Sequence, residues 1–266
     1  MKLTCKFTII LLFLNIASFG PLLNASETST DAANPTVGGT TGLITTPSAF
    51  TGWNNSDFAM DFGYHFIFLK DNHSHIPMIN IYFLKMVELG AAYDVQSSDG
   101  DDYVIHAKVN FFNDGSSYIA FGGNFQHLKY EEGGDDNFFG QIYFAVSYRA
   151  KFFTMTADTT LVVGKTFNEG TQNADFDFSM GLDLELFPSF FKKYIHWVNE
   201  YSNYTYTMDP ASITPHSRGA YNTGIRILVL KNLEKFKLNL SFIGTDLFDE
   251  HDRSFCMNIV FGFAAI

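Results

Sequence analysis

Residues 175–186 read Asp-Phe-Asp-Phe-Ser-Met-Gly-Leu-Asp-Leu-Glu-Leu, and this stretch decides the fold. Every second residue is apolar, and the residues between them are acidic or small. A period of two places all the apolar side chains on one face of a β-strand, whereas a helix would mix the two kinds. The run also reaches the roughly 9 to 11 residues that a tilted strand needs to cross a bilayer. The stretch therefore predicts a membrane-spanning strand.

Eleven further runs of the same kind repeat this element along the chain. With residues 175–186 they make twelve expected strands, at residues 57–69, 76–84, 87–96, 102–112, 117–126, 138–150, 159–167, 175–186, 195–206, 220–230, 235–245 and 254–265. A closed antiparallel bacterial barrel with both termini on one side requires an even number of strands. The sequence therefore predicts an all-β fold, an antiparallel outer-membrane β-barrel of twelve strands.

The joins between the expected strands alternate in length. This alternation indicates which face of each strand contacts lipid and which lines the lumen. Compact joins lie at residues 84–86, 113–115, 151–156, 188–193 and 231–234, and longer or more acidic joins lie at 70–75, 97–101, 127–137, 168–174, 207–219 and 246–253. Outer-membrane barrels have short periplasmic turns and longer surface loops, whereas a soluble sandwich has no reason to sort its loops. We therefore expect the apolar face of each strand in lipid and the acidic face in the lumen.

The N-terminus has the features of an exported protein. Lys2 and Lys6 precede an apolar run at residues 7–19 and a small-residue patch at residues 24–26, which is typical of a cleaved secretory signal peptide. We expect the signal peptide at residues 1–25 and the barrel at residues 56–266. Between them, residues 26–55 lack a period of two, and we interpret them as an N-terminal periplasmic spacer followed by an ordered or plug-like stretch, here called the lead-in segment.

Charge and cysteine content exclude several classes of protein. Removing Lys2 and Lys6 from the 17 basic residues, against 28 acidic ones, leaves the exported part with a net charge near −13. Such an acidic chain is not a nucleic-acid-binding protein. Cys256 is the only cysteine after Cys5 departs with the signal, so no internal disulfide forms. The sequence has no phosphate-binding loop, closed-spacing zinc motif or redox pair, and we expect no cofactor, metal or catalytic residues.

Charged residues of the expected lumen face form two groups. The acidic group is Asp57, Asp61, Glu88, Asp94, Asp177, Asp183, Glu185 and Glu200, and the basic group is Lys108, Arg149, Arg226 and Lys237. Such opposite walls can create a transverse field across a narrow aqueous pore that mildly favours cations, or they can close the interior through ion pairs. Both interpretations remain open. We expect a bidentate ion pair between Glu200 and Arg226 on neighbouring strands.

Three other patterns are weaker. Aromatic residues near the compact joins predict a periplasmic interfacial girdle of Phe50, Trp53, Phe152, Phe153, Phe187, Phe190, Phe191, Tyr194 and Trp197. The first surface loop carries ligand-type residues at Asp71, His73 and His75, and the loops at residues 131–136 and 249–252 are acidic, but solvated loops are the ordinary reading of both. A lipid hydrolase would need a base beside Ser202, yet His196 lies six residues away, roughly 20 Å along a strand.

Four separated stretches carry a family resemblance. Residues 42–49, Gly-Leu-Ile-Thr-Thr-Pro-Ser-Ala, resemble the GLxxTPtA opening of exopolysaccharide-associated (YjbH-like) outer-membrane barrel proteins. Residues 200–202, 222–226 and 253–254 resemble the closing strands of the same group. The resemblance implies a barrel and, as one possible function, an accessory role in exopolysaccharide export.

These observations favour a small porin-like channel for ions or polar solutes in the cell outer membrane. The alternative is a non-conducting structural or surface-exposed envelope protein, and a lipid hydrolase is a minor alternative. The expected partners are outer-membrane lipid and lipopolysaccharide-type glycolipid, the barrel-assembly machinery and small polar solutes.

Overall fold

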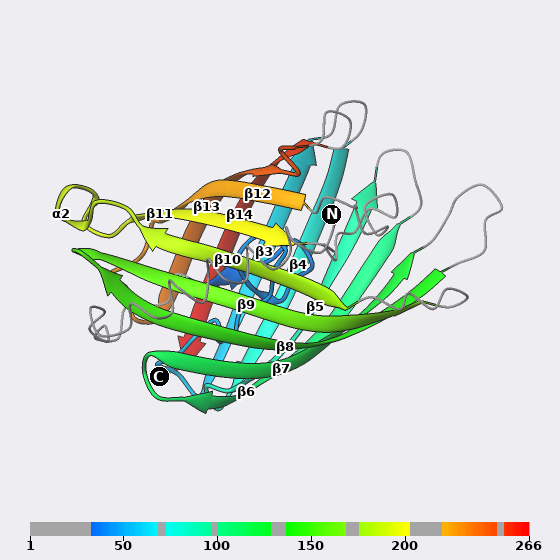
Figure 1. Cartoon of the computed structure of the whole chain (residues 1–266), viewed down its shortest axis with the longest axis horizontal. Coiled ribbons are helices and arrows are strands. Elements are labelled where there is room, and N and C mark those ends of the chain that lie inside the picture. Colours follow the sequence, from blue (N-terminus) through cyan, green and yellow to red (C-terminus); the bar gives the residue numbers. More distant parts are fainter. Residues whose placement is uncertain are drawn as a thin grey trace, which may run out of the picture.

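The structure, a computed structural model, describes residues 33–68, 73–96, 101–128, 137–168, 176–202, 220–248 and 253–265. Within these residues twelve antiparallel strands form one closed barrel (Figure 1). The strands are β3 (Phe58–Phe68), β4 (His73–Phe83), β5 (Val87–Gln96), β6 (Asp102–Asn113), β7 (Ser117–Leu128), β8 (Asn137–Phe152), β9 (Met155–Asn168), β10 (Asp177–Glu185), β11 (Ile195–Ser202), β12 (Ala220–Leu228), β13 (Phe236–Thr245) and β14 (Ser254–Ala265). Pairing of β14 with β3 closes the barrel, which confirms the predicted fold.

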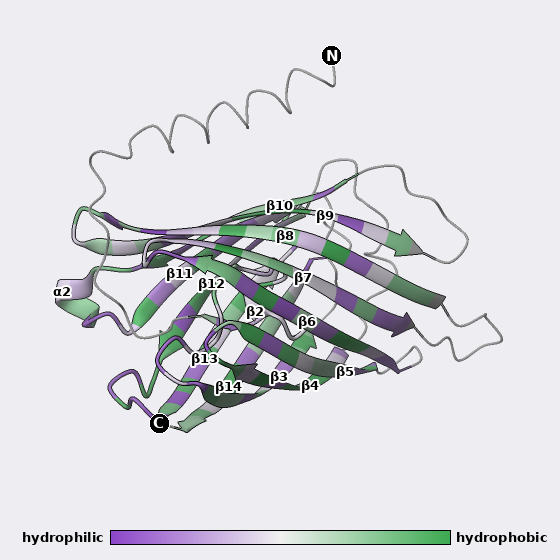
Figure 2. Cartoon of the chain, turned by 90° about the horizontal axis from the view of Figure 1, so that it is seen from below, coloured by the Kyte–Doolittle hydropathy of each residue, from purple (hydrophilic) through white to green (hydrophobic). Residues whose placement is uncertain are grey.

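The alternation seen in the sequence becomes an inner and an outer face. Figure 2 shows polar and apolar residues alternating along the strands. The apolar residues point outward, as at Phe144, Val163 and Ile259, which are 50%, 46% and 46% exposed. A soluble monomer does not expose an apolar surface of this extent. A closed barrel satisfies its own backbone hydrogen bonds, so this belt can face hydrocarbon.

The compact joins lie together at one end of the barrel. One of them contains the short helix α2 (Pro188–Phe191) between β10 and β11. In the join between β6 and β7, Gly115 takes φ +92°, and the Asp114 carboxylate accepts the backbone N–H groups of Ser116 and Ser117. The longer joins contain all the internal gaps in the described residues, so the predicted acidic loops at residues 131–136 and 249–252 lie outside them.

No helix in the described part of the chain is both long and apolar enough to cross a membrane. The expected signal peptide at residues 1–25 lies outside the described residues and stays a prediction.

The described part of the lead-in segment, residues 33–55, lies inside the barrel and not in the periplasm (Figure 1). Residues 34–53 are all buried, and the short strands β1 (Asn34–Pro35) and β2 (Thr41–Gly42) pair with each other there. Lys237, near the compact-join end, donates to the carbonyl oxygens of both Ala33 and Gly52. Val37 packs near the opposite end against Ile76 and neighbouring wall residues. The segment is therefore a loop that enters and leaves through the compact-join end.

This placement corrects part of the predicted aromatic girdle. Phe50 and Trp53 are 3% and 4% exposed inside the lumen, because each finds a specific partner there. The Phe50 ring packs against Tyr118, and the indole N–H of Trp53 donates to Asp61 at 2.8 Å. Aromatic residues at the tips of the compact joins do project outward, with Phe153 and Phe190 85% and 77% exposed.

The apolar outer face of the barrel predicts the effect of a charge placed on it. Phe144 lies at the middle of β8, so Phe144→Arg would put a cation near the middle of the bilayer. We expect the free energy of unfolding in lipid vesicles, measured by urea titration, to fall by about 2–4 kcal/mol. Phe153→Arg, at a turn tip, is the matched control and should change it little. Equal losses for the two variants would contradict the lipid-facing assignment.

Candidate functional site

The lumen gathers nearly all the charged residues predicted to line it. Those placed there with at most 7% exposure are Asp61, Glu88, Asp94, Lys108, Arg149, Asp177, Asp183, Glu185, Glu200, Arg226 and Lys237. Asp57 was wrongly placed in this group. Its side chain is 78% exposed and lies 3.7 Å from the Lys85 ammonium, because Asp57 precedes β3 at the barrel rim.

The strongest contact between the lead-in segment and the wall is made by Glu200 of β11. Its carboxylate accepts three consecutive backbone N–H groups, from Ile44 at 3.0 Å, Thr45 at 2.8 Å and Thr46 at 3.0 Å. The Thr45 hydroxyl and the Asn222 amide also donate to it. Hydrogen bonds to an ionised acceptor are stronger than neutral ones. Glu200 therefore holds the tip of the turn at residues 44–46 in place.

Arg226 of β12 binds the same turn from its other side. Its guanidinium donates to the Leu43 carbonyl oxygen at 2.9 Å and to the Asp183 carboxylate at 2.8 Å. His196 lies 2.7 Å from Asp183 and completes this group. The predicted ion pair of Arg226 with Glu200 is wrong, because the strand register sets Arg226 opposite His196, four residues from Glu200.

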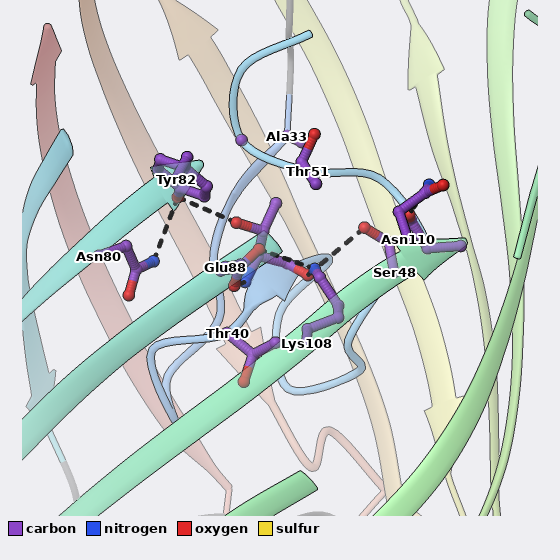
Figure 3. Close-up of polar contacts among 12 residues, drawn as sticks. Ala33, Thr40, Ser48, Thr51, Asn80, Tyr82, Glu88, Lys108 and Asn110 are labelled. Carbon is purple, nitrogen blue, oxygen red and sulfur yellow. Dashed lines mark hydrogen bonds and ion pairs between the residues drawn. The ribbon is translucent and has the colours of Figure 1, made fainter. Parts of the chain in front are cut away.

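Tyr82, Glu88 and Lys108 form a second clamp on the opposite wall (Figure 3). This clamp holds Thr41. The Thr41 N–H donates to Glu88 at 2.6 Å, and its carbonyl oxygen accepts from the Lys108 ammonium at 2.9 Å. Glu88 and Lys108 are themselves 2.9 Å apart, and the Tyr82 hydroxyl lies 3.0 Å from the Thr41 hydroxyl. Both backbone groups of Thr41 are thus paired with charged wall side chains.

The returning half of the lead-in segment is also bound through its backbone. The Ala49 N–H donates to the Ser147 hydroxyl at 2.9 Å, and the Ala49 carbonyl oxygen accepts from Asn110 at 2.6 Å. At the next residue of the segment, the Phe50 ring lies 4.7 Å from the Arg149 guanidinium, measured to the ring centre, and Arg149 forms a bidentate pair with Asp158. Near the compact-join end, Asp61 accepts from Lys237 at 2.6 Å.

Two glycine residues allow close packing, one within the lead-in segment and one between the segment and the wall. A Cβ atom on Gly42 would lie 2.1 Å from the Thr46 carbonyl oxygen and 2.8 Å from Pro47. On the wall, a Cβ atom on Gly181 would lie 2.4 Å from the Asn199 carbonyl oxygen and 2.3 Å from the Leu43 side chain. Only glycine fits at these two positions while residues 42–47 keep their fold.

Other predicted candidates do not assemble into a site. His73 and His75 lie on β4 and not in a loop, and His75 stacks on the Phe66 ring at 4.6 Å on the outer face. Ser202 and His196 point inward at separate levels of β11, and His196 contacts Asp183. In the residues described, no group of three or more His, Cys, Asp or Glu side chains could hold a metal ion.

The sequence did not indicate the neutral wall residues that bind the lead-in segment. They are Asn80, Tyr82, Asn110, Ser147 and Asn222, and each one contacts the segment or a charged clamp residue. The sequence indicated only that these residues occupy the alternate strand positions predicted to face the lumen. It could not show that their partners are backbone groups of the N-terminal residues.

Comparisons with known proteins agree on the fold. No protein-family model and no curated protein matches the chain. Among solved structures, the KdgM porin covers 77% of this chain and 99% of its own, with 10% identity and a TM-score of 0.50. KdgM in complex with disordered oligogalacturonate gives 11% identity, 78% and 99% coverage and 0.49. Omp33 of Acinetobacter baumannii gives 8% identity, 79% and 98% coverage and 0.47. The chain thus shares the closed barrel fold of the KdgM porin.

The Glu200 clamp predicts how firmly the lead-in segment is held. Glu200→Gln keeps the shape of the side chain but sets an amide against the N–H groups of residues 44–46. We expect a loss of about 1.5–3 kcal/mol in the free energy of unfolding. Glu185→Gln is the matched control, because Glu185 is also buried but bonds only with the half-exposed Lys193 among the described residues. An equal loss in the control would contradict the clamp.

Gly42→Ala tests the fold of the segment itself. The added methyl group collides with the Thr46 carbonyl oxygen, so the segment must shift at a cost of about 1–3 kcal/mol. We expect proteinase K to cut residues 33–55 faster than in the unsubstituted protein, as followed by mass spectrometry. Gly140→Ala serves as the control, since a Cβ atom there meets nothing within 4 Å. Unchanged cleavage in Gly42→Ala would exclude the close turn.

Proposed function

We propose that this protein is a porin-like outer-membrane channel for ions or small polar solutes, whose lumen the lead-in segment closes in the state described. The observation that carries the proposal is the charged lumen wall. Asp61, Glu88, Asp183 and Arg226 are all buried against the segment or one another. Replacing buried ion pairs by apolar side chains is often neutral or stabilising. A barrel filled only by apolar side chains would have no need of such a wall.

The mode of attachment also favours a movable segment. Glu88, Lys108, Ser147 and Glu200 bind its backbone through hydrogen bonds, which water can replace. The apolar contacts are divided among four separate clusters and do not form one continuous core. Release of the segment would leave a hydrated wall with an excess of carboxylates. Such a lumen favours polar solutes and cations over anions.

A filled lumen gives specific support to a second function, that of a non-conducting envelope protein. Residues 34–53 are all buried, so conduction through the barrel requires them to move. In that case the segment is a permanent internal brace. An accessory role in exopolysaccharide export rests on the resemblance of residues 42–49 and 200–202 alone. We assign no catalytic role, since a serine nucleophile needs an adjacent base and Ser202 lies about 20 Å along β11 from His196.

A reversible tether tests the channel. In a Cys256→Ser background, Ala49→Cys with Ser147→Cys places two thiols where the Ala49 N–H now lies 2.9 Å from the Ser147 hydroxyl. We expect the unsubstituted barrel to give discrete current steps in a planar bilayer. The oxidised tethered variant should give none, and reduction should restore them.

Single substitutions Ala49→Cys and Ser147→Cys in the same background are the controls for the tether, since neither can form the bond. Equal currents from the oxidised and reduced double variant would show that the segment does not close the pore. Stable insertion of the unsubstituted protein without current would leave the non-conducting function.

A further inference from the structure

A small cavity lies where the lead-in segment meets the wall near the longer joins. Its volume is about 20 Å³, and its lining includes Thr45 and Thr46 of the segment together with Gln141, Asp177, Ser179 and Ser202 of the wall. A cavity needs roughly 10–15 Å³ to hold one water-sized guest. The cavity therefore has room for a single ion of that size. Side-chain oxygen atoms line part of it, and Pro47, Val162 and Phe178 line the rest.

Asp177 differs from Asp61 and Asp183 in having no cationic partner within 4 Å among the described residues. It is 7% exposed, and its carboxylate accepts hydrogen bonds from two neutral donors, the Gln141 amide at 2.8 Å and the Thr166 hydroxyl at 2.6 Å. Both donors bind Oδ2, so Oδ1 can accept a further ligand. By contrast, Asp61 and Asp183 each lie within 2.8 Å of a lysine or arginine. A buried carboxylate needs compensation by a counter-charge.

Thr46 supplies a second, independent indication. Its side chain is 1% exposed, and its hydroxyl has no hydrogen-bond partner within the described part of the chain. Its backbone N–H is bound by Glu200, so the residue cannot turn away without breaking that clamp. A hydroxyl held in this way at the cavity offers a lone pair to a guest. Hard cations such as Ca²⁺ and Na⁺ are bound by carboxylate, hydroxyl and amide oxygens of this kind.

We propose that this cavity binds one hard cation through Asp177 and the hydroxyl of Thr46, which joins the lead-in segment to β10. The ligands come from two parts of the chain more than 100 residues apart, so the cation crosslinks segment and wall. A single carboxylate among neutral oxygens gives weak affinity, of the order of 10⁻⁴–10⁻³ M for Ca²⁺. This range is matched to ions outside a cell and not to trace metals. Binding of a cation at this cavity does not require the barrel to conduct.

Calcium titration of the refolded, glycolipid-free protein in detergent tests the site. Raising free Ca²⁺ to about 10 mM should raise the Tm of the barrel by about 3 °C, because ligand binds only the folded state. NaCl and MgCl₂ at matched ionic strength separate a specific site from general screening. Isothermal calorimetry with CaCl₂ should give about one ion per chain.

Asp177→Asn should abolish the calcium-dependent shift and the calorimetric binding, and Thr46→Val should weaken both. Glu185→Gln, which removes a buried carboxylate at the other end of the lumen, should leave both unchanged. If Asp177→Asn does not fold, Thr46→Val decides. No calcium shift in the unsubstituted protein, or an undiminished shift in Asp177→Asn or Thr46→Val, overturns the proposal. Because current is not measured, these outcomes are independent of those of the tether experiment.

Discussion

Burial of an irregular stretch of backbone inside the barrel is the constraint on which the rest of the structure depends. The lead-in segment cannot pair its N–H and C=O groups along a sheet edge, because the wall strands already pair with each other. Every unpaired buried group costs free energy. Glu200 meets this cost for three consecutive N–H groups at once. The charged lumen wall thus replaces the hydrogen-bonding role of water.

Residues 42–49 and the facing residues of β11 and β12 are the two sides of this contact. Residues 42–49 form the turn inside the lumen, and Glu200, Asn222 and Arg226 hold it. Gly42 is needed for the turn to close on itself, since a Cβ atom would strike the Thr46 carbonyl oxygen. These residues therefore form one structural unit, a bound internal turn.

Sequence alone was sufficient for the barrel, because a period of two and the alternating joins act locally along the chain. It was insufficient for the lead-in segment, which lacks that period and binds residues such as Glu200, 155 positions away from Thr45. The predicted Glu200–Arg226 pair failed for a related reason. Parity places both residues inward, but the strand register sets Asn222 opposite Glu200. Phe50 and Trp53 were misplaced because an aromatic residue near a strand end suits a girdle and an internal core equally.

Amide hydrogen exchange at residues 44–46 tests the central claim, that the turn is held inside the lumen by Glu200, most directly. In the protein refolded into nanodiscs, the N–H groups of Ile44, Thr45 and Thr46 should exchange as slowly as those of the neighbouring wall strands, because all three bind a buried carboxylate. Exchange of all three at the rate of an unstructured peptide would contradict the account.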